Sequence, residues 1–301
     1  MTASHRDVEF KTLDGLTLKA WFYPAAAKGP CIIMSHGFAG IRHHNLSHFA
    51  ECFQAEGWST LVYDDNRNFG DSEGLPRNEI DPTFQVRDYF DAFDFAASQS
   101  EVDGARIAYW GTSLSGGNAI CAAAIDKRIR AVVVQSPFVS GEHQTAPLAA
   151  MLPAIFANRT SVREGKASVM VPVVPATLEE AESGRSPAVL GTVETFHFMN
   201  DMEKSGGEWK NEVTLQSMFN LMAHEPKRFV HRIAPTPLLM VVPEQDTTVE
   251  TKAQLDMYRL ALEPKQIHLV KDCGHFGIYG GGVGFDENIR VQIEFLRRIL
   301  E

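Results

Sequence analysis

The stretch that decides the fold is Trp110-Gly111-Thr112-Ser113-Leu114-Ser115-Gly116-Gly117. It follows a predicted strand, 106–110, and opens a predicted helix, 114–125. A sharp strand-to-helix turn pushes a serine hydroxyl outward, as a nucleophile requires. Small residues two positions to either side let the backbone pass: Gly111 fills the first position, and Ser115 stands where glycine is usual. The pattern predicts that Ser113 is a nucleophile. The alternative is a Gly/Ser-rich helix start that only packs against the sheet.

Strands and helices alternate on both sides of this turn. The dipeptide Asp14-Gly15 indicates a hairpin between the first two strands. Strands are predicted at 8–11, 16–23, 31–34, 59–64, 106–110, 131–135, 238–242 and 267–270. Helices are predicted at 45–56, after Asp81-Pro82, at 114–125, near 252–262 and after Asp286. This alternation predicts an α/β protein with a mostly parallel sheet and helices on both faces.

The alternation stops between about 138 and 232, where prolines, short polar runs and Met-rich apolar clusters replace it. We therefore predict a core of residues 1–137 and 233–301, with 138–232 inserted as a cap or lid over the catalytic end of the sheet. Its large apolar residues are Met151, Leu152, Phe156, Phe196, Phe198, Met199, Met202, Trp209, Met218 and Phe219. At least half of them are expected to form the cap's own core, and the rest an adaptable acyl pocket.

Three further motifs follow predicted strands. In His36-Gly37-Phe38-Ala39-Gly40, the backbone N–H of Phe38 is placed to form an oxyanion hole together with the N–H of Leu114. His36 itself is interpreted as structural. After strand 238–242 comes Asp246, with Glu244 and Glu250 as competitors that spacing does not exclude.

After the last strand stands Cys273-Gly274-His275-Phe276, where a glycine-flanked histidine fits a loop that lays the ring against the serine. The order serine, acid, histidine at 113, 246 and 275 matches the chain order of α/β-hydrolases and neither of the two protease orders. The sequence therefore predicts Ser113, Asp246 and His275 as a catalytic triad.

Composition excludes several other classes. The 301 residues carry a formal net charge of −10 and no Lys/Arg cluster, so nucleic-acid binding is not expected. The four cysteines are far apart, with no CxxC pair, so we do not expect zinc ligation. Acyl transfer by the predicted triad needs no metal or organic cofactor, so we expect none. No secretory signal or apolar run of membrane-spanning length is visible, which favours a cytoplasmic protein without a membrane partner.

The chain resembles the α/β-hydrolase superfamily over its whole length, including the loop 63–74. Four further strings are characteristic: Asn66-Arg67-Asn68-Phe69-Gly70, Ser115-Gly116-Gly117, Gln135-Ser136-Pro137-Phe138-Val139-Ser140 and Trp209-Lys210-Asn211-Glu212-Val213-Thr214-Leu215. In these strings the chain is similar to a dienelactone-hydrolase-like group that includes fungal polyketide transferases and thiohydrolases. One departure is Gly277, since the group has an acidic residue two positions after the histidine.

The resemblance implies an α/β-hydrolase fold with an eight-stranded sheet. It also implies a hydrolase or acyltransferase acting on an ester or thioester of a hydrophobic acyl group, with polyketide-type and carrier-protein-bound acyl groups among the candidates. Two alternatives stay open: a C–C bond hydrolase acting on a diketone-type substrate, and a non-catalytic ligand-binding homologue. The pattern leaves the substrate, the acceptor and the oligomeric state open.

Overall fold

A computed structural model describes residues 4–64, 67–204 and 206–301. Its centre is an eight-stranded sheet with the order β1-β2-β4-β3-β5-β6-β9-β10. The pairs β1–β2 and β2–β4 are antiparallel, and the other pairs of this sheet are parallel. The predicted mostly parallel sheet is therefore confirmed.

The strands of the large sheet are β1 (Arg6–Lys11), β2 (Thr17–Tyr23), β3 (Gly29–Ser35), β4 (Ser59–Tyr63), β5 (Val102–Thr112), β6 (Ala131–Gln135), β9 (Leu238–Pro243) and β10 (Lys265–Val270). The helices beside it are α1 (Leu46–Ala55), α2 (Pro82–Ala97), α3 (Leu114–Ile125), α9 (Thr251–Leu260) and α10 (Phe285–Leu300). Between β6 and β9 lie α4 (Gly141–Gln144), α5 (Leu152–Arg163), β7 (Met170–Val171), α6 (Leu178–Glu182), α7 (Val193–Glu203), β8 (Val213–Thr214), α8 (Leu215–Met222) and three short 3-10 helices (Ala146–Met151, Pro226–Arg228 and Val230–Arg232).

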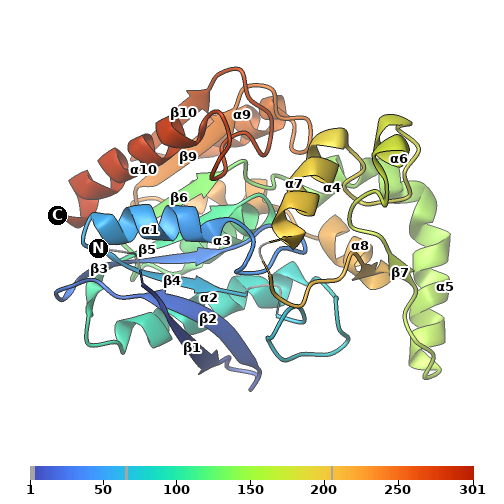
Figure 1. The fold of residues 1–301 in the computed structure, drawn as a ribbon, viewed down its shortest axis with the longest axis horizontal. Coiled ribbons are helices and arrows are strands. Elements are labelled where there is room, and N and C mark those ends of the chain that lie inside the picture. The colour runs from blue at the N-terminus through green and yellow to red at the C-terminus, as the bar shows by residue number, and fades with distance from the viewer. Residues whose placement is uncertain (1–3, 65–66, 205) are drawn as a thin grey trace.

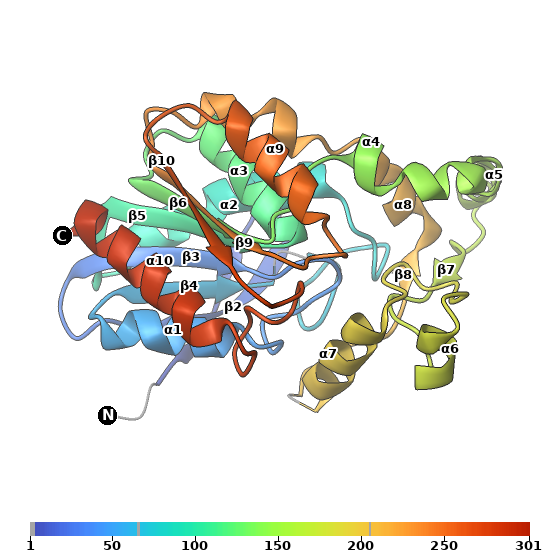
Figure 2. The same ribbon diagram turned by 90° about the horizontal axis from the view of Figure 1, so that it is seen from above.

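Helices cover both faces of the sheet (Figures 1 and 2). Helices α2, α3 and α9 pack on one face, in a buried cluster with Tyr89, Ile120 and Met257. Helices α1 and α10 pack on the other face, where Phe49 and Phe295 join its cluster. The central strands β3, β4, β6 and β9 are buried at every position, as expected for a sheet covered on both faces.

We call residues 138–232 the inserted segment, because they lie between β6 and β9. Its described residues add no strand to the large sheet; β7 and β8 pair with each other. Figures 1 and 2 show its helices gathered at one end of the sheet. A third cluster joins it to the core through Ile41 and Leu114 on the core side, with Met199 and Met218 from α7 and α8.

Buried polar side chains lock the carboxyl ends of the strands to α10. Asn288 donates to Gln135 Oε1 at 2.7 Å and to the Ile278 carbonyl at 2.9 Å. Gln292 also donates to Gln135 Oε1, at 3.1 Å, and accepts from the Trp110 indole at 2.7 Å. Satisfied networks of this kind specify one geometry, because a broken member would leave a buried polar group unpaired. They therefore hold β5, β6 and the chain after residue 275 in one fixed relation.

Two buried arginines hold the loop 63–74. Arg67 donates to both oxygens of Asp14, at 2.9 and 2.7 Å, and to Asp88 at 3.0 Å. Arg42 forms an ion pair with Asp64, which lies at the end of β4. The loop that carries part of the family resemblance is thus pinned by charge pairs, although its residues 65–66 lie outside the described residues.

Candidate active site

The turn at Ser113 joins β5 directly to α3. Ser113 has φ 54° and ψ −122°, a conformation that an L-residue rarely adopts and that costs about 1–3 kcal/mol. The turn is tight: a Cβ on Gly111 would lie 2.2 Å from the Ser115 carbonyl oxygen. The Ser113 amide donates to the Gln135 carbonyl at 3.0 Å, which ties the turn to the end of β6. A strained, well-anchored serine at a strand end is the geometry that the sequence predicted.

Ser115, which replaces the usual second glycine, takes part in holding this turn. Its fully buried hydroxyl donates to the Ser35 carbonyl at 2.7 Å and accepts from the Thr112 amide at 2.9 Å. The hydroxyl therefore links the ends of β3 and β5 directly. The departure from the usual pattern adds an anchor to the turn and leaves its shape intact.

The backbone after β3 passes close to the serine. A Cβ on Gly37 would lie 2.8 Å from the Ser113 Cβ, so only glycine permits this approach. The next amide is that of Phe38, whose side chain lines a cavity with Ser113 and Leu114. Within the described ranges, no protein acceptor takes the N–H of Phe38 or of Leu114. Phe38 and Leu114 thus each keep a backbone donor in reserve, and both residues line the cavity that Ser113 lines.

The inserted segment contacts this turn as well. The Trp209 indole donates to the Ala39 carbonyl at 2.8 Å, and Ala39 has φ 56°. His36 lies buried on the core side, and burial lowers its pKa to about 4, so its ring is neutral at neutral pH. A Cβ on Gly40 would lie 1.9 Å from His36 Nδ1, which shows how closely the turn wraps the ring. This close packing agrees with a structural role for His36.

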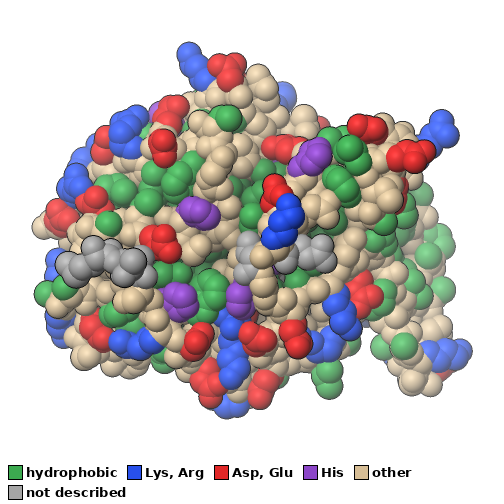
Figure 3. Space-filling view, in the orientation of Figure 1, with side chains coloured by type: hydrophobic (Ala, Val, Ile, Leu, Met, Phe, Trp, Pro, Cys, Tyr) green, Lys and Arg blue, Asp and Glu red, His purple; other side chains and the backbone are tan. Residues whose placement is uncertain are grey.

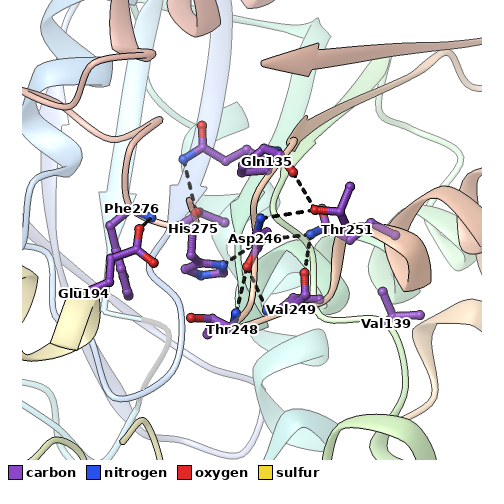
Figure 4. A network of polar contacts seen from close by, with 12 residues as sticks. Gln135, Val139, Glu194, Asp246, Thr248, Val249, Thr251, His275 and Phe276 are labelled. Carbon is purple, nitrogen blue, oxygen red and sulfur yellow. Dashed lines mark hydrogen bonds and ion pairs between the residues drawn. The ribbon is translucent and has the colours of Figure 1, made fainter. Parts of the chain in front are cut away.

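Asp246 is hydrogen-bonded to His275 (Figure 4). His275 Nδ1 lies 2.8 Å from Asp246 Oδ2, and both side chains are at most 1% exposed. Since a carboxylate only accepts, Nδ1 carries the hydrogen and Nε2 is left as the basic nitrogen. The amides of Thr248 and Val249 donate to Oδ1 at 3.0 and 2.9 Å, and Gln254 Nε2 donates to Oδ2 at 2.9 Å. The carboxylate is therefore fixed on all sides.

The two competing carboxylates lie elsewhere. Glu244 is exposed and accepts from the Asp272 amide at 3.2 Å. Glu250 is exposed and lies 3.3 Å from His143 Nε2. Of the three candidates, only Asp246 contacts His275.

Two cavities meet at Ser113. A small one is lined by Ser113, His275, His36, Gly37, Phe38, Leu190, Phe198, Met199, Thr248, Phe276 and Tyr279. The larger one, of about 200 Å³, is lined by Phe38, Ser113, Leu114, Phe138, Gln144, Thr145, Leu148, Val189, Leu190, Leu221, Thr248 and Val249. From the inserted segment, the larger cavity takes mainly leucine and valine. None of the ten large apolar residues singled out in the sequence lines this larger cavity, whereas Phe198 and Met199 line the small one.

Two site residues were not predicted from the sequence. Thr248 lines both cavities, and its buried hydroxyl has no hydrogen-bond partner among the described residues. Glu194 of α7 accepts a hydrogen bond from the Phe276 amide at 2.9 Å, 82 positions away in the chain (Figure 4). No local pattern signals such a contact, because it depends on how the inserted segment folds back onto the core.

Three observations describe the chain beyond the site itself. Among residues 4–64, 67–204 and 206–301, no group of three or more His, Cys, Asp or Glu side chains is placed to hold a metal ion. No helix of the described chain is long and apolar enough to cross a membrane. Figure 3 shows Lys and Arg side chains interspersed with Asp and Glu over the face drawn.

Comparison with known proteins places the chain in a family. Residues 27–276 match the model of the family described as "Serine aminopeptidase, S33". A thiohydrolase of Eupenicillium brefeldianum is 37% identical, with 93% of this chain and 90% of that protein covered. Polyketide transferase ATR5 of Stachybotrys chlorohalonatus is 33% identical over 99% of this chain and 98% of its own length.

The crystal structure of the α/β-hydrolase GrgF from Penicillium sp. sh18 is also similar. Its TM-score is 0.85 at 32% identity, and the match covers 99% of each chain. The sheet, its helices and the position of the serine turn agree with this fold. The chain therefore belongs to the serine aminopeptidase S33 family and has the α/β-hydrolase fold.

Proposed function

We propose that the protein is a serine acyl hydrolase or acyltransferase that acts on a thioester or ester of a hydrophobic, polyketide-type acyl group. The observation that carries the proposal is the strained Ser113 turn, which shares a cavity with the Asp246-bound His275. The names of the relatives, thiohydrolase and polyketide transferase, support the same acyl chemistry. In this proposal Ser113 is the nucleophile, His275 the general base and Asp246 its orienting acid.

The reaction then proceeds through an acyl-Ser113 intermediate. His275 Nε2 takes the hydroxyl proton while Ser113 Oγ bonds to the acyl carbon, and the carbonyl oxygen becomes an oxyanion. The N–H groups of Phe38 and Leu114 stabilise that oxyanion; losing one such donor typically costs about 3–4 kcal/mol of transition-state stabilisation. The thiol or alcohol leaves with the proton from His275, and water or an acceptor alcohol resolves the intermediate. This route requires no cofactor.

The larger cavity is proposed to hold the acyl chain. Apolar side chains, among them Leu148, Val189 and Leu221, make up most of its lining. Burying a CH₂ group there contributes about 0.8 kcal/mol, so a long acyl chain gains more than an acetyl group. Gln144, Thr145 and Thr248 add polar groups to the same lining, which suits an acyl chain that carries oxygen.

The inserted segment is proposed to act as a cap on a core of residues 1–137 and 233–301. Leu190 from this segment lines both cavities at Ser113. A cover of this kind limits the entry of water to an acyl-enzyme and so favours transfer to a bound acceptor. The acyl donor is proposed to be a small-molecule thioester or the same acyl group on a carrier protein.

The test is direct trapping of the intermediate, followed by product partitioning. The protein is incubated with thioesters of acetyl, medium and long acyl groups, free and carrier-bound, and acylated Ser113 is identified by mass spectrometry. Acid and ester products are then quantified with and without candidate alcohols. We expect an acyl adduct on Ser113 that forms faster from longer chains. No adduct from any donor, together with no labelling by a fluorophosphonate, would favour a non-catalytic ligand-binding protein.

A further inference from the structure

The loop that carries His275 has an anchor outside the core. Between Cys273 and Gly277, the core holds the loop through the Asp246–His275 hydrogen bond and through the bond from the Gln245 amide to the Cys273 carbonyl at 3.0 Å. The Phe276 amide instead donates to Glu194 Oε1, on helix α7 of the inserted segment, at 2.9 Å. This anchor is a direct hydrogen bond that the loop donates to α7 (Figure 4).

The bond acts on the peptide that directly follows His275. A peptide unit is planar, so holding the Phe276 N–H fixes the orientation of the whole unit and with it the rotation about the His275 Cα–C bond. Asp246 fixes the imidazole ring at Nδ1. The two carboxylates thus hold His275 at two points, one on the side chain and one on the backbone.

A second contact from the same face of α7 supports the first. Phe198 lies one helical turn after Glu194, and residues four apart share a helix face. Its ring stacks on Phe276, with the centroids 4.1 Å apart and the planes 20° apart. The same ring meets Tyr279 edge-on at 5.0 Å. Helix α7 therefore contacts the loop through a hydrogen bond at Glu194 and through the ring of Phe198.

The loop is also shaped to receive the carboxylate. A Cβ on Gly274 would lie 2.6 Å from Glu194 Oε1 and 2.9 Å from Oε2, so a side chain at 274 would push the carboxylate away. Gly274 does not have a positive φ, so space rather than backbone conformation is what glycine supplies here. The close approach of Glu194 and the absence of a side chain at 274 belong together.

We propose that Glu194 is a positioning residue for the general base, through which the inserted segment completes the catalytic site. This inference rests on the proposed function, because it gives His275 the role of base. A competing role is local: Glu194 lies in the first turn of α7, after the N-cap Thr192, where an acidic side chain stabilises a helix. The two roles differ in what a glutamine would preserve, since glutamine keeps the acceptor oxygen and loses the charge.

The experiment compares Glu194→Ala, Glu194→Gln and Gly274→Ala with the parent protein. The readouts are kcat and KM on an acyl thioester and the rate at which a small fluorophosphonate labels Ser113. The small probe leaves the acyl cavity unused, so its rate reports on activation of the serine. The matched control is Glu179→Ala, which removes an exposed acidic residue from the first turn of α6. Circular dichroism and thermal melting verify that each variant is folded.

We expect Glu194→Ala to lower kcat and the labelling rate by about 10- to 100-fold, because small displacements of a catalytic group are costly. KM should stay within about threefold, since uniform binding is untouched. Glu194→Gln and Glu179→Ala should stay close to the parent. Gly274→Ala should lower kcat and the labelling rate as much as Glu194→Ala does. A double variant that carries both substitutions should be no slower than either single variant, because both substitutions break the same contact.

Any of three results would overturn the inference. Glu194→Ala could be labelled as fast as the parent, Glu194→Gln could lose as much activity as Glu194→Ala, or the losses in kcat from Glu194→Ala and Gly274→Ala could add up in the double variant. An equal loss in Glu194→Gln would point to the helix-terminal charge instead. A parent protein that the probe does not label at Ser113 would overturn the proposed function itself. The failure of the inference and the failure of the function are therefore distinguishable.

Discussion

The sheet core and the inserted segment are built in different ways. In the core, β3, β4, β6 and β9 are buried along their whole length, and Trp110 is fully enclosed. In the inserted segment, helix α5 buries only Ile155 and Asn158 of its twelve residues, and Phe156 is 55% exposed. Figures 1 and 2 show α5 standing at the far edge of the molecule.

This difference separates two tasks. The core supplies the candidate reacting groups Ser113, Asp246 and His275, and dense packing lets it hold Ser113 in a strained conformation. The inserted segment supplies much of the wall of the larger cavity. Changes in the core are therefore expected to affect the rate for every substrate. Most changes in the inserted segment should affect the choice of substrate, and Glu194 is the expected exception.

The largest effect is expected at Ser113. Ser113→Ala removes the nucleophile and changes little in packing, so we expect kcat to fall by about 10⁴-fold or more while the melting temperature is kept. The measurement is turnover of an activated ester alongside thermal melting. A rate near that of the parent would show that another residue is the nucleophile.

The next effect is expected at the acid. Asp246→Asn should lower kcat by about 10³- to 10⁴-fold, because an amide at this place favours the wrong histidine tautomer. Glu244→Gln serves as the control, since Glu244 does not contact His275. Steady-state kinetics on one ester compares the two variants. A small loss at Asp246 with a large one at Glu244 would reassign the role of the acid.

Acid should destabilise the protein through its buried histidines. Burial lowers the pKa of His224 from 6.5 to about 3, so its contribution to stability is complete above pH 6.5 and is lost as the pH falls toward 3. At pH 5 this loss amounts to about 2 kcal/mol. His224→Gln should therefore reduce the drop in unfolding free energy between pH 7 and pH 5 by that amount.

Urea unfolding at the two pH values provides the measurement, with exposed His231→Gln as the control. An unchanged drop in His224→Gln would show that this histidine does not carry the acid sensitivity. His36 in the core should behave in the same way, because burial also lowers its pKa, to about 4.

The smallest effect concerns the acyl cavity. Leu148 lies in the wall of the larger cavity, so Leu148→Trp should shorten the acyl chain that it accepts. We expect kcat/KM for long acyl thioesters to fall by about 10-fold, with little change for acetyl thioesters. Leu178→Trp, at an exposed position of the inserted segment, is the control. Equal losses for short and long chains would contradict the assignment of this cavity to the acyl chain.

Local pattern was sufficient for the core. The strand 131–135 and the helix 114–125 were predicted with the bounds that the structure has, and Asp81-Pro82 does begin α2, with the Asp81 carboxylate accepting from the Thr83 amide. Such elements are predictable because hydrophobic period and capping act over a few residues. Strand ends were less well predicted: β5 begins at Val102 rather than 106, because pairing with β3 extends it.

The sequence predicted Asp246 as the acid, but spacing alone did not exclude Glu244 or Glu250. Glu244, Asp246 and Glu250 all follow β9 closely, so their distance in sequence from the end of the strand does not show which one faces His275. Contact with His275 depends on the loop after β10, and on Gln254 and the amides of Thr248 and Val249 turning toward Asp246. The lining of the larger cavity was likewise beyond local pattern, because none of the large apolar residues singled out from the sequence lines it and smaller leucines and valines do.

By itself, the sequence determined the alternating core, the serine turn between β5 and α3, and the chain order of serine, acid and histidine. These features follow from short-range rules of period, capping and turn chemistry. Only the tertiary structure decided that Asp246 is the carboxylate at His275, and that Glu194 reaches the peptide after His275 from 82 positions away. The reason is physical: such contacts depend on how separate elements pack, and no periodicity within either element encodes the position of the other.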